Sequence, residues 1–205
     1  MFVKRAVCYE GVSLRIVYRV IKMLELTLGK LRIAFTFSFF AVIGFVSAAG
    51  GEVQKQLFII LLCSLMHELG HITAMCAFGL PPESITFYVG GIRLSDSSLN
   101  CSKPRRAVIL LAGCAVDLLS AGVSLILGYR GVFAAAHLLL GLFNLLPFRY
   151  FDGGRLYSEL TGKDPPVFIR IAALLPLAFL ALYSALNGEL PVSLIAACVL
   201  IILDG

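Results

Sequence analysis

The sequence is poor in charged residues. Only 14% of its 205 residues are Asp, Glu, Lys or Arg, whereas 60% are hydrophobic and the mean hydropathy is +0.96. Soluble globular domains carry about 25% charged residues, so this composition excludes an ordinary soluble domain. The chain is therefore predicted to be an integral membrane protein, with one helical bundle and no appended soluble domain.

Two further features are missing from the sequence. Its six cysteines are scattered and none belongs to a CxxC pair, so we interpret them as reduced, small apolar core residues and not as metal ligands. The N-terminus also lacks the pattern of a cleavable leader, because its charged stretch is long and no small-residue cleavage site precedes the apolar runs. Neither secretion nor a disulfide framework is indicated.

Long apolar runs dominate what is present. A helix rises about 1.5 Å per residue, so about 20 apolar residues span the ~30 Å hydrocarbon core of a bilayer. The fold class predicted from these runs is an all-α polytopic membrane protein of about six transmembrane helices. The candidate spans are residues 33–50, 56–79, 107–128, 132–147, 167–186 and 190–203, of which the fourth and sixth are short for a full crossing.

Basic residues follow an alternating pattern between these spans. Of the 17 Lys and Arg residues, 15 lie before the first span, after the second or after the fourth. Cytoplasmic loops carry such an excess, so both termini are predicted to face the cytoplasm of a cell membrane. The asymmetry accounts for the net charge of +5, and no nucleic-acid partner is expected.

The N-terminal segment, residues 1–32, is predicted to be basic and amphipathic, and residues 33–205 to form the membrane domain. Residues 12–32 interleave Arg and Lys with Leu, Ile and Val, which suits a basic helix lying on an anionic leaflet. Met23 is an alternative translation start.

The stretch SLMHELGHITAM, residues 64–75, places ionisable residues inside the second predicted span. His67 and His71 are four residues apart, so they lie about 40° apart on one helical face and their imidazoles converge. Glu68 is offset by one residue, which holds its carboxylate beside the point of convergence. This is the HExxH arrangement of zinc hydrolases, in which the glutamate takes a proton from water.

A catalytic zinc site needs a third protein ligand, for which His137, Asp117 and Asp152 are the candidates. Topology favours Asp152, because it follows the fourth span on the cytoplasmic side, and His71 lies roughly 12 Å from the cytoplasmic end of the second. His137 is expected to be a packed or lipid-interface histidine. Asp152 lies in FNLLPFRYFDGG, where Pro147 must break the helix. The alternative to a ligand role is that Asp152 is a solvated turn residue.

HELGH together with NLLPFRYFDGG resembles the site-2 protease family of intramembrane zinc metalloproteases, over residues 33 to about 160. Within that family the chain looks most like the stage IV sporulation proteases, which process an inactive pro-sigma factor by regulated intramembrane proteolysis. The resemblance implies that His67, His71 and Asp152 hold Zn²⁺ and that Glu68 activates the water. It also implies that Asn144 contacts the substrate backbone or the developing oxyanion.

Another family feature is a re-entrant hairpin after the second span. The stretch ITFYVGGIRL fits it, with β-prone residues on both sides of the turn-forming pair Gly90 and Gly91. Its edge could pair with an unwound substrate strand, or the stretch could be an ordinary connecting hairpin.

The third span departs from the family pattern. Where the family commonly shows AGP followed by Asn, this chain reads LAGCAVDLL, with Cys114 and Asp117 at the proline and asparagine positions. Asp117 could take the hydrogen-bonding role of the asparagine, orient the zinc ligands, or be protonated and structural.

The resemblance implies a membrane-associated protein substrate, the lipid bilayer and an inhibitory membrane partner as interaction partners. The alternative function is a catalytically inactive pseudoprotease that acts as a membrane scaffold. A metal transporter is disfavoured, because the spans contain few acidic residues. The nucleotide-sensing CBS domain of other sporulation proteases is lacking, so direct nucleotide control is not expected.

Overall fold

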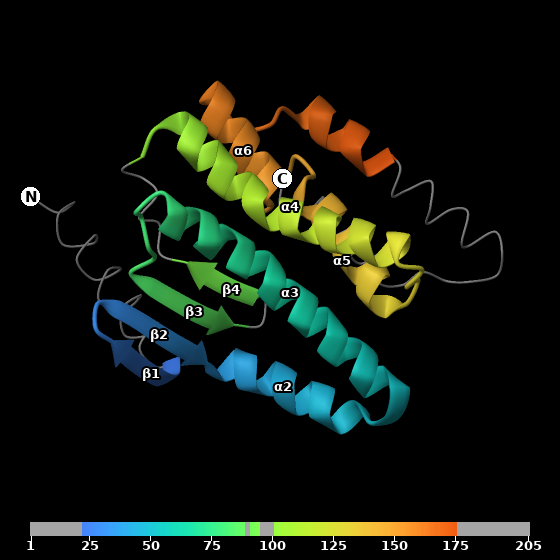
Figure 1. Cartoon of the computed structure of the whole chain (residues 1–205). Coiled ribbons are helices and arrows are strands. Elements are labelled where there is room, and N and C mark those ends of the chain that lie inside the picture. The colour runs from blue at the N-terminus through green and yellow to red at the C-terminus, as the bar shows by residue number, and fades with distance from the viewer. Residues whose placement is uncertain (1–21, 89–90, 95–100, 176–205) are drawn as a thin grey trace, which may run out of the picture. The chain divides into compact units, whose positions relative to one another are not determined.

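The computed structural model describes residues 22–88, 91–94 and 101–175 (Figure 1). The chain divides into two compact units, residues 1–100 and 101–205. The first contains β1 (Lys22–Leu28), β2 (Leu31–Thr36), α2 (Phe37–Ala49), α3 (Gly51–Ala77), β3 (Ser84–Tyr88) and β4 (Gly91–Leu94). The second contains α4 (Lys103–Ile126), α5 (Val132–Asn144), α6 (Asp152–Thr161) and helical residues 167–175.

The first unit is built on a four-stranded sheet in the order β1-β2-β3-β4. β1 and β2 pair antiparallel, as do β3 and β4, whereas β2 and β3 are parallel. Parallel neighbours need a crossover connection, which α2 and α3 supply (Figure 1). Thr36 links the sheet to α2. Its hydroxyl donates to the Phe87 carbonyl of β3 at 2.9 Å and accepts from the Phe39 N–H in the first turn of α2.

The prediction of a basic helix over residues 12–32 is wrong for its described part. Leu24, Leu26 and Leu28 alternate with polar residues, which is the period of a strand and not of a helix. The antiparallel register sets Leu26 opposite Ile33. Residues 12–21 lie outside the described residues. The predicted all-α class is therefore wrong in part. The described chain is mainly helical, but it includes a four-stranded mixed sheet where only one hairpin was predicted.

The hairpin predicted at ITFYVGGIRL is confirmed as the pairing of β3 with β4. Ile85 lies opposite Leu94, and Tyr88 lies opposite Gly91. The guanidinium of Arg93 also lies over the Tyr88 ring, 5.2 Å from its centre. Cross-strand contacts of this kind stabilise a tight hairpin.

Two described helices are long and apolar enough to cross a membrane, α3 with 27 residues and α4 with 24. They correspond to the second and third predicted spans. α2 and α5 have 13 residues each, or about 20 Å of helix, and α2 is shorter than predicted because residues 33–36 belong to β2. The fifth span is helical through residue 175, and the rest of it and the sixth lie outside the described residues.

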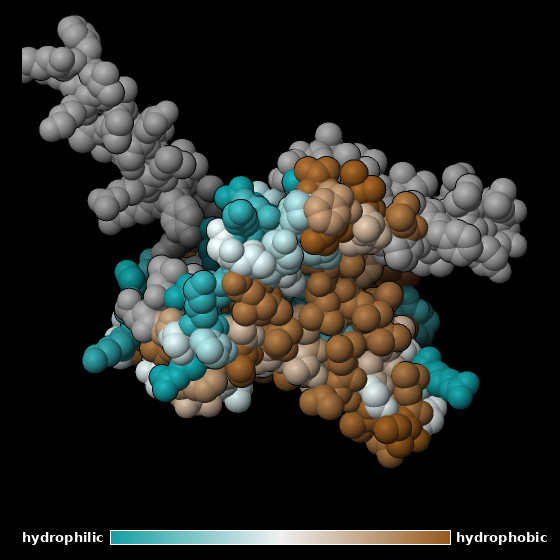
Figure 2. Space-filling model, turned by 90° about the horizontal axis from the view of Figure 1, so that it is seen from above, coloured by the Kyte–Doolittle hydropathy of each residue, from teal (hydrophilic) through white to brown (hydrophobic). Residues whose placement is uncertain are grey.

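Large apolar side chains lie on the surface of these helices. Phe45, Leu119 and Ile126 are 71%, 68% and 86% exposed, where a water-soluble helix would place polar residues. Figure 2 shows many hydrophobic residues on the visible surface. Large exposed apolar side chains on helices of this length indicate contact with lipid.

In the second unit α4 packs against both α5 and α6. An ion pair joins α4 to α6, where the Arg106 guanidinium donates to the Glu159 carboxylate at 2.9 Å and also to the Cys101 carbonyl at 3.2 Å. The pair is about four-fifths buried on both sides, so it holds the C-terminal half of α6 against the first turns of α4.

Candidate metal centre

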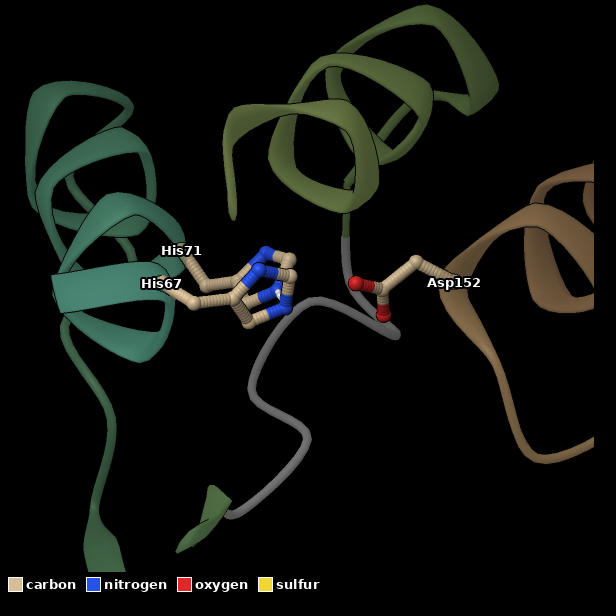
Figure 3. Close-up of side chains that lie close together, drawn as sticks. All are labelled: His67, His71 and Asp152. Atoms are coloured by element: carbon tan, nitrogen blue, oxygen red, sulfur yellow. Dashed lines mark hydrogen bonds between the residues drawn. The ribbon is translucent and has the colours of Figure 1, made fainter. Parts of the chain in front are cut away.

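His67 and His71 lie on the buried stripe of α3. Both are nearly inaccessible, with 4% and 7% exposure. Their Nε2 atoms are 3.1 Å apart and the ring planes are inclined by 82°. Figure 3 shows both imidazoles projecting from the same side of the helix. The convergence predicted from their four-residue spacing is confirmed.

This pair of nitrogens fits a zinc ion. Zinc binds imidazole nitrogen at about 2.0–2.1 Å with tetrahedral angles, which places two such ligand atoms roughly 3.3 Å apart. The observed 3.1 Å separation is close to that value. Two imidazole nitrogens at this distance are prearranged to share one cation.

Glu68 follows His67 directly on α3 and is half-buried. One residue corresponds to a rotation of about 100° around the helix, so its carboxylate is beside the histidine stripe and not on it. α3 ends at Ala77, six residues beyond His71, which places His71 about 9 Å from the helix end instead of the predicted 12 Å.

Asp152 is the first residue of α6 and is 8% exposed (Figure 3). Its burial rules out the solvated-turn alternative. The buried thiol of Cys114, on α4, lies 4.0 Å from its Oδ2 and points a weak donor at it. A carboxylate at a helix N-terminus is also favoured by the helix dipole. Sequence reasoning missed Cys114 as a neighbour of Asp152, because only the packing of α4 on α6 brings them together.

Gly153 and Gly154 fix the position of Asp152. A Cβ on Gly153 would stand 2.1 Å from the Leu145 carbonyl oxygen, and one on Gly154 would stand 2.0 Å from that of Phe148. The first turn of α6 is therefore in direct backbone contact with the preceding loop. No side chain larger than hydrogen fits there.

We expect Gly153→Ala to destabilise the protein by about 1–3 kcal/mol, because the clash is with backbone and can be relieved only by moving the loop. Gly122→Ala is the matched control. Gly122 lies within α4 with open space around it, so that change should be neutral or stabilising by up to about 1 kcal/mol. Thermal unfolding in detergent measures both. Equal midpoints for the two variants would contradict the close approach.

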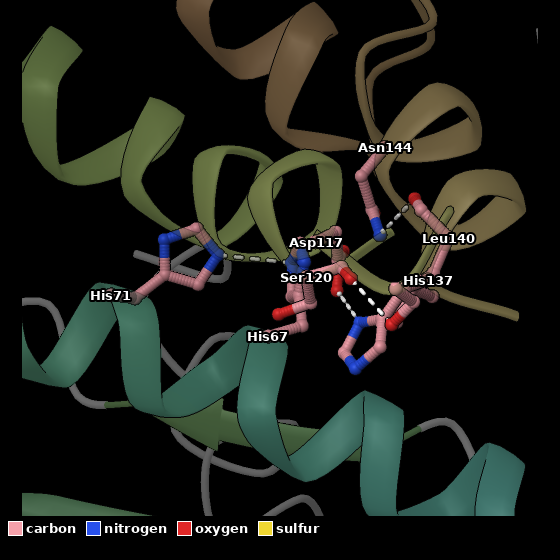
Figure 4. Close-up of polar contacts among 8 residues, drawn as sticks. His67, His71, Asp117, Ser120, His137, Leu140 and Asn144 are labelled. Atoms are coloured by element: carbon pink, nitrogen blue, oxygen red, sulfur yellow. Dashed lines mark hydrogen bonds and ion pairs between the residues drawn. The ribbon is translucent and has the colours of Figure 1, made fainter. Parts of the chain in front are cut away.

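The remaining predicted substrate contacts lie at element ends. Asn144 is the last residue of α5, and its side-chain N–H donates to the Leu140 carbonyl at 3.1 Å (Figure 4). Gly91 opens β4, directly after the hairpin turn. Gly90 lies outside the described residues.

Asp117 and His137 are paired with each other. The His137 Nδ1–H donates to Asp117 Oδ1 at 2.7 Å, and both residues are fully buried, on α4 and α5 (Figure 4). His137 is thus a packed histidine. From the sequence the two were separate ligand candidates, and their only shared feature was a polar group in an apolar span.

No protein-family model matches the chain. Two curated proteins, both called "Putative zinc metalloprotease Rip3" and from two strains of Mycobacterium tuberculosis, are 34% identical to it over 131 residues. The match covers 57% of this chain and 32% of each relative, so the chain spans about a third of their length. A solved structure, "Site-2 Protease from Methanocaldococcus jannaschii", superposes with a TM-score of 0.57 at 20% identity, covering 88% of this chain and 92% of that one.

The chain has a site-2 protease fold. The curated relatives are named as zinc metalloproteases, and the structural neighbour shows the fold alone. Neither comparison addresses the sporulation group.

Proposed function

We propose that this chain is an intramembrane zinc metalloprotease that hydrolyses a peptide bond in or next to a membrane-associated segment of a substrate protein. The observation that carries the proposal is the 3.1 Å approach of the His67 and His71 nitrogens on a helix apolar enough to cross a bilayer. The zinc metalloprotease relatives support the same reaction class.

His67, His71 and Asp152 would hold the zinc ion, two through imidazole nitrogen and one through a carboxylate oxygen. Each is buried and offers one ligand atom. When bound, zinc supplies Lewis acidity, which makes water nucleophilic near neutral pH and polarises the scissile carbonyl.

Glu68 acts as the general base and then as the general acid. Its carboxylate takes a proton from the attacking water and later delivers it to the leaving amine. It stands beside the histidine stripe on the same helix, so the helix backbone sets the place of its Cα relative to the two histidines.

Asn144 and the β3–β4 hairpin would bind the substrate. One amide hydrogen of Asn144 is used by the Leu140 carbonyl, which orients the side chain and leaves its second N–H for a substrate oxygen. β4 is an outer strand of the sheet within the described residues. Its outer edge, which begins at Gly91, could pair with an unwound substrate segment and expose the peptide bond.

The proposed enzyme would be a multi-pass cell-membrane protein with both termini in the cytoplasm. A membrane partner would hold it inactive, and it would have no nucleic-acid partner. An inactive pro-sigma factor or a regulatory membrane protein would be its substrate, as in the sporulation proteases it resembles. Because His71 is about 9 Å from the end of α3, cleavage is expected near the cytoplasmic end of the substrate span.

Comparison of the membrane proteomes of cells that carry active or Glu68→Gln protein tests the function and identifies the substrate. We expect one or a few membrane-associated proteins to persist at full length only in the Glu68→Gln cells, with the truncated product in the others. Identical proteomes, together with a growth defect on deletion of the whole protein, would favour the pseudoprotease scaffold.

A further inference from the structure

The proposed chemistry leaves the Asp117–His137 pair unused. It joins α4 to α5 through a 2.7 Å hydrogen bond between two side chains with no exposed surface. Burying such polar groups is unfavourable unless each is satisfied by its partner, so apolar residues could have filled the same space at lower free energy. The pair is therefore more than packing material.

The helix backbones approach closely at this point. A Cβ on Gly141 would stand 3.0 Å from the Asp117 Cβ and 3.2 Å from two Leu118 carbons, so any larger residue would push α5 away. The hydrogen bond and the Gly141 contact therefore both involve the turn of α4 that contains Asp117. The hydrogen bond has a preferred direction and length, which the glycine contact lacks.

Asn144 lies on the same face of α5 as this contact. At about 100° per residue, His137, Gly141 and Asn144 fall within about 60° of one another. Asn144 is one turn beyond Gly141, at the last residue of the helix. Rotation or sliding of α5 on α4 would therefore move the Asn144 amide directly.

We propose that the Asp117–His137 pair is a positioning device that fixes the rotation and axial register of α5 on α4 and thereby aims the Asn144 amide at the substrate. The role of Asn144 in this inference rests on the proposed function. The geometry of the α4–α5 contact lies wholly within the second unit. Asp117 and His137 are positioning residues and touch neither substrate nor metal in this scheme.

The hydrogen-bond arrangement of the pair suits this role. With its hydrogen on Nδ1 the imidazole donates to Asp117, and Nε2 is a buried acceptor with no hydrogen-bond partner among the described residues. His137 is thus held by one directional bond and by edge-on packing of the Phe133 ring at 4.5 Å. Among the described residues, this bond ties the ring on α5 to one point of α4.

The test replaces the pair without leaving a buried unpaired group. In Asp117→Ala/His137→Leu both partners become apolar and their combined volume stays close to that of the original pair, so the protein should fold and unfold at a similar temperature. Asp117→Asn is the conservative variant, because its amide oxygen still accepts from Nδ1–H. Ser124→Ala is the matched control, since Ser124 is a buried polar residue of α4 whose bond, to the Ser120 carbonyl, stays within the helix.

The first readout is a distance that does not depend on activity. Spin labels at the exposed positions Val108 on α4 and Leu142 on α5 report the register of the two helices, in a background without Cys76, Cys101 and the undescribed cysteines. We expect one narrow distance distribution in the parent, Asp117→Asn and Ser124→Ala proteins, and a broadened or shifted one in the apolar double variant. An unchanged distribution in that double variant would overturn the proposal.

The second readout is catalytic, with fluorescein-labelled casein as the probe. We expect the apolar double variant to lose about 10- to 100-fold in kcat/KM with an unchanged zinc content, and Asp117→Asn to stay within about threefold of the parent. Added to Asn144→Ala, the double change should cause no further loss. If the combined variant loses kcat/KM by the product of the two separate losses, the pair does not act through Asn144. A fall in zinc content would lead to the same conclusion. If the parent lacks Glu68-dependent cleavage, the proposed function fails and the distance measurement alone decides the inference.

Discussion

Glu68→Gln is expected to abolish proteolysis by the purified protein while zinc content and membrane insertion stay unchanged. The glutamine keeps the size and hydrogen-bonding shape of the side chain but cannot accept a proton from water, so the loss of rate should be at least about 10²–10⁴-fold. Because Glu68 projects beside the His67–His71 stripe and not from it, the ligand atoms keep their places. Cleavage of labelled casein and elemental analysis for zinc measure the two properties.

Glu52→Gln is the control on the same helix. Glu52 lies in the first turn of α3 and pairs with Lys55 at 2.7 Å, with both side chains more than two-thirds exposed. Exposed pairs of this kind contribute at most about 1 kcal/mol, so that variant should cleave like the parent. Cleavage that persists in Glu68→Gln would remove Glu68 from the reaction.

The local half of the candidate site was predictable from sequence. His67 and His71 are separated by one helical turn, so their convergence follows from helix geometry once the span is recognised as a helix. The hairpin at Gly90 and Gly91 was predictable for the same reason, since turn chemistry acts within a few residues.

The contacts between distant residues were not predictable. Asp117 and His137 are 20 positions apart, and nothing in either segment indicates that α4 and α5 meet at those turns. The close approach of Gly153 to the Leu145 carbonyl is equally a property of packing.

Hydrophobicity alone misassigned the N-terminal segment. Residues 22–32 contain enough Leu and basic residues to be read as part of an amphipathic helix, but the alternation in β1 has the period of a strand. The deciding interaction is the parallel pairing of β2 with β3, which sets Ile33 beside Ile85 from the other end of the α2–α3 crossover. The alternation is visible locally, but the pairing partner of Ile33 is 52 residues away and is not.

Asp152→Ala is expected to empty the metal centre while the protein remains folded. The change removes a carboxylate at the N-terminus of α6, which weakens the helix by only about 0.3–1 kcal/mol through the helix dipole. Loss of a zinc ligand is far more severe, because even residues that only support ligands change metal affinity by about 10–100-fold. Zinc in the purified variant should fall from one ion per chain to a small fraction.

Asp164→Ala separates a metal effect from a charge effect. Asp164 is exposed just beyond the end of α6 and accepts a hydrogen bond from Ser158 at 3.3 Å, so its removal changes the net charge identically without touching the site. That variant should keep its full zinc content. An unchanged stoichiometry in Asp152→Ala would remove Asp152 from the ligand set, and the buried thiol of Cys114, 4.0 Å from the Asp152 carboxylate, would then be the next ligand to test by Cys114→Ala.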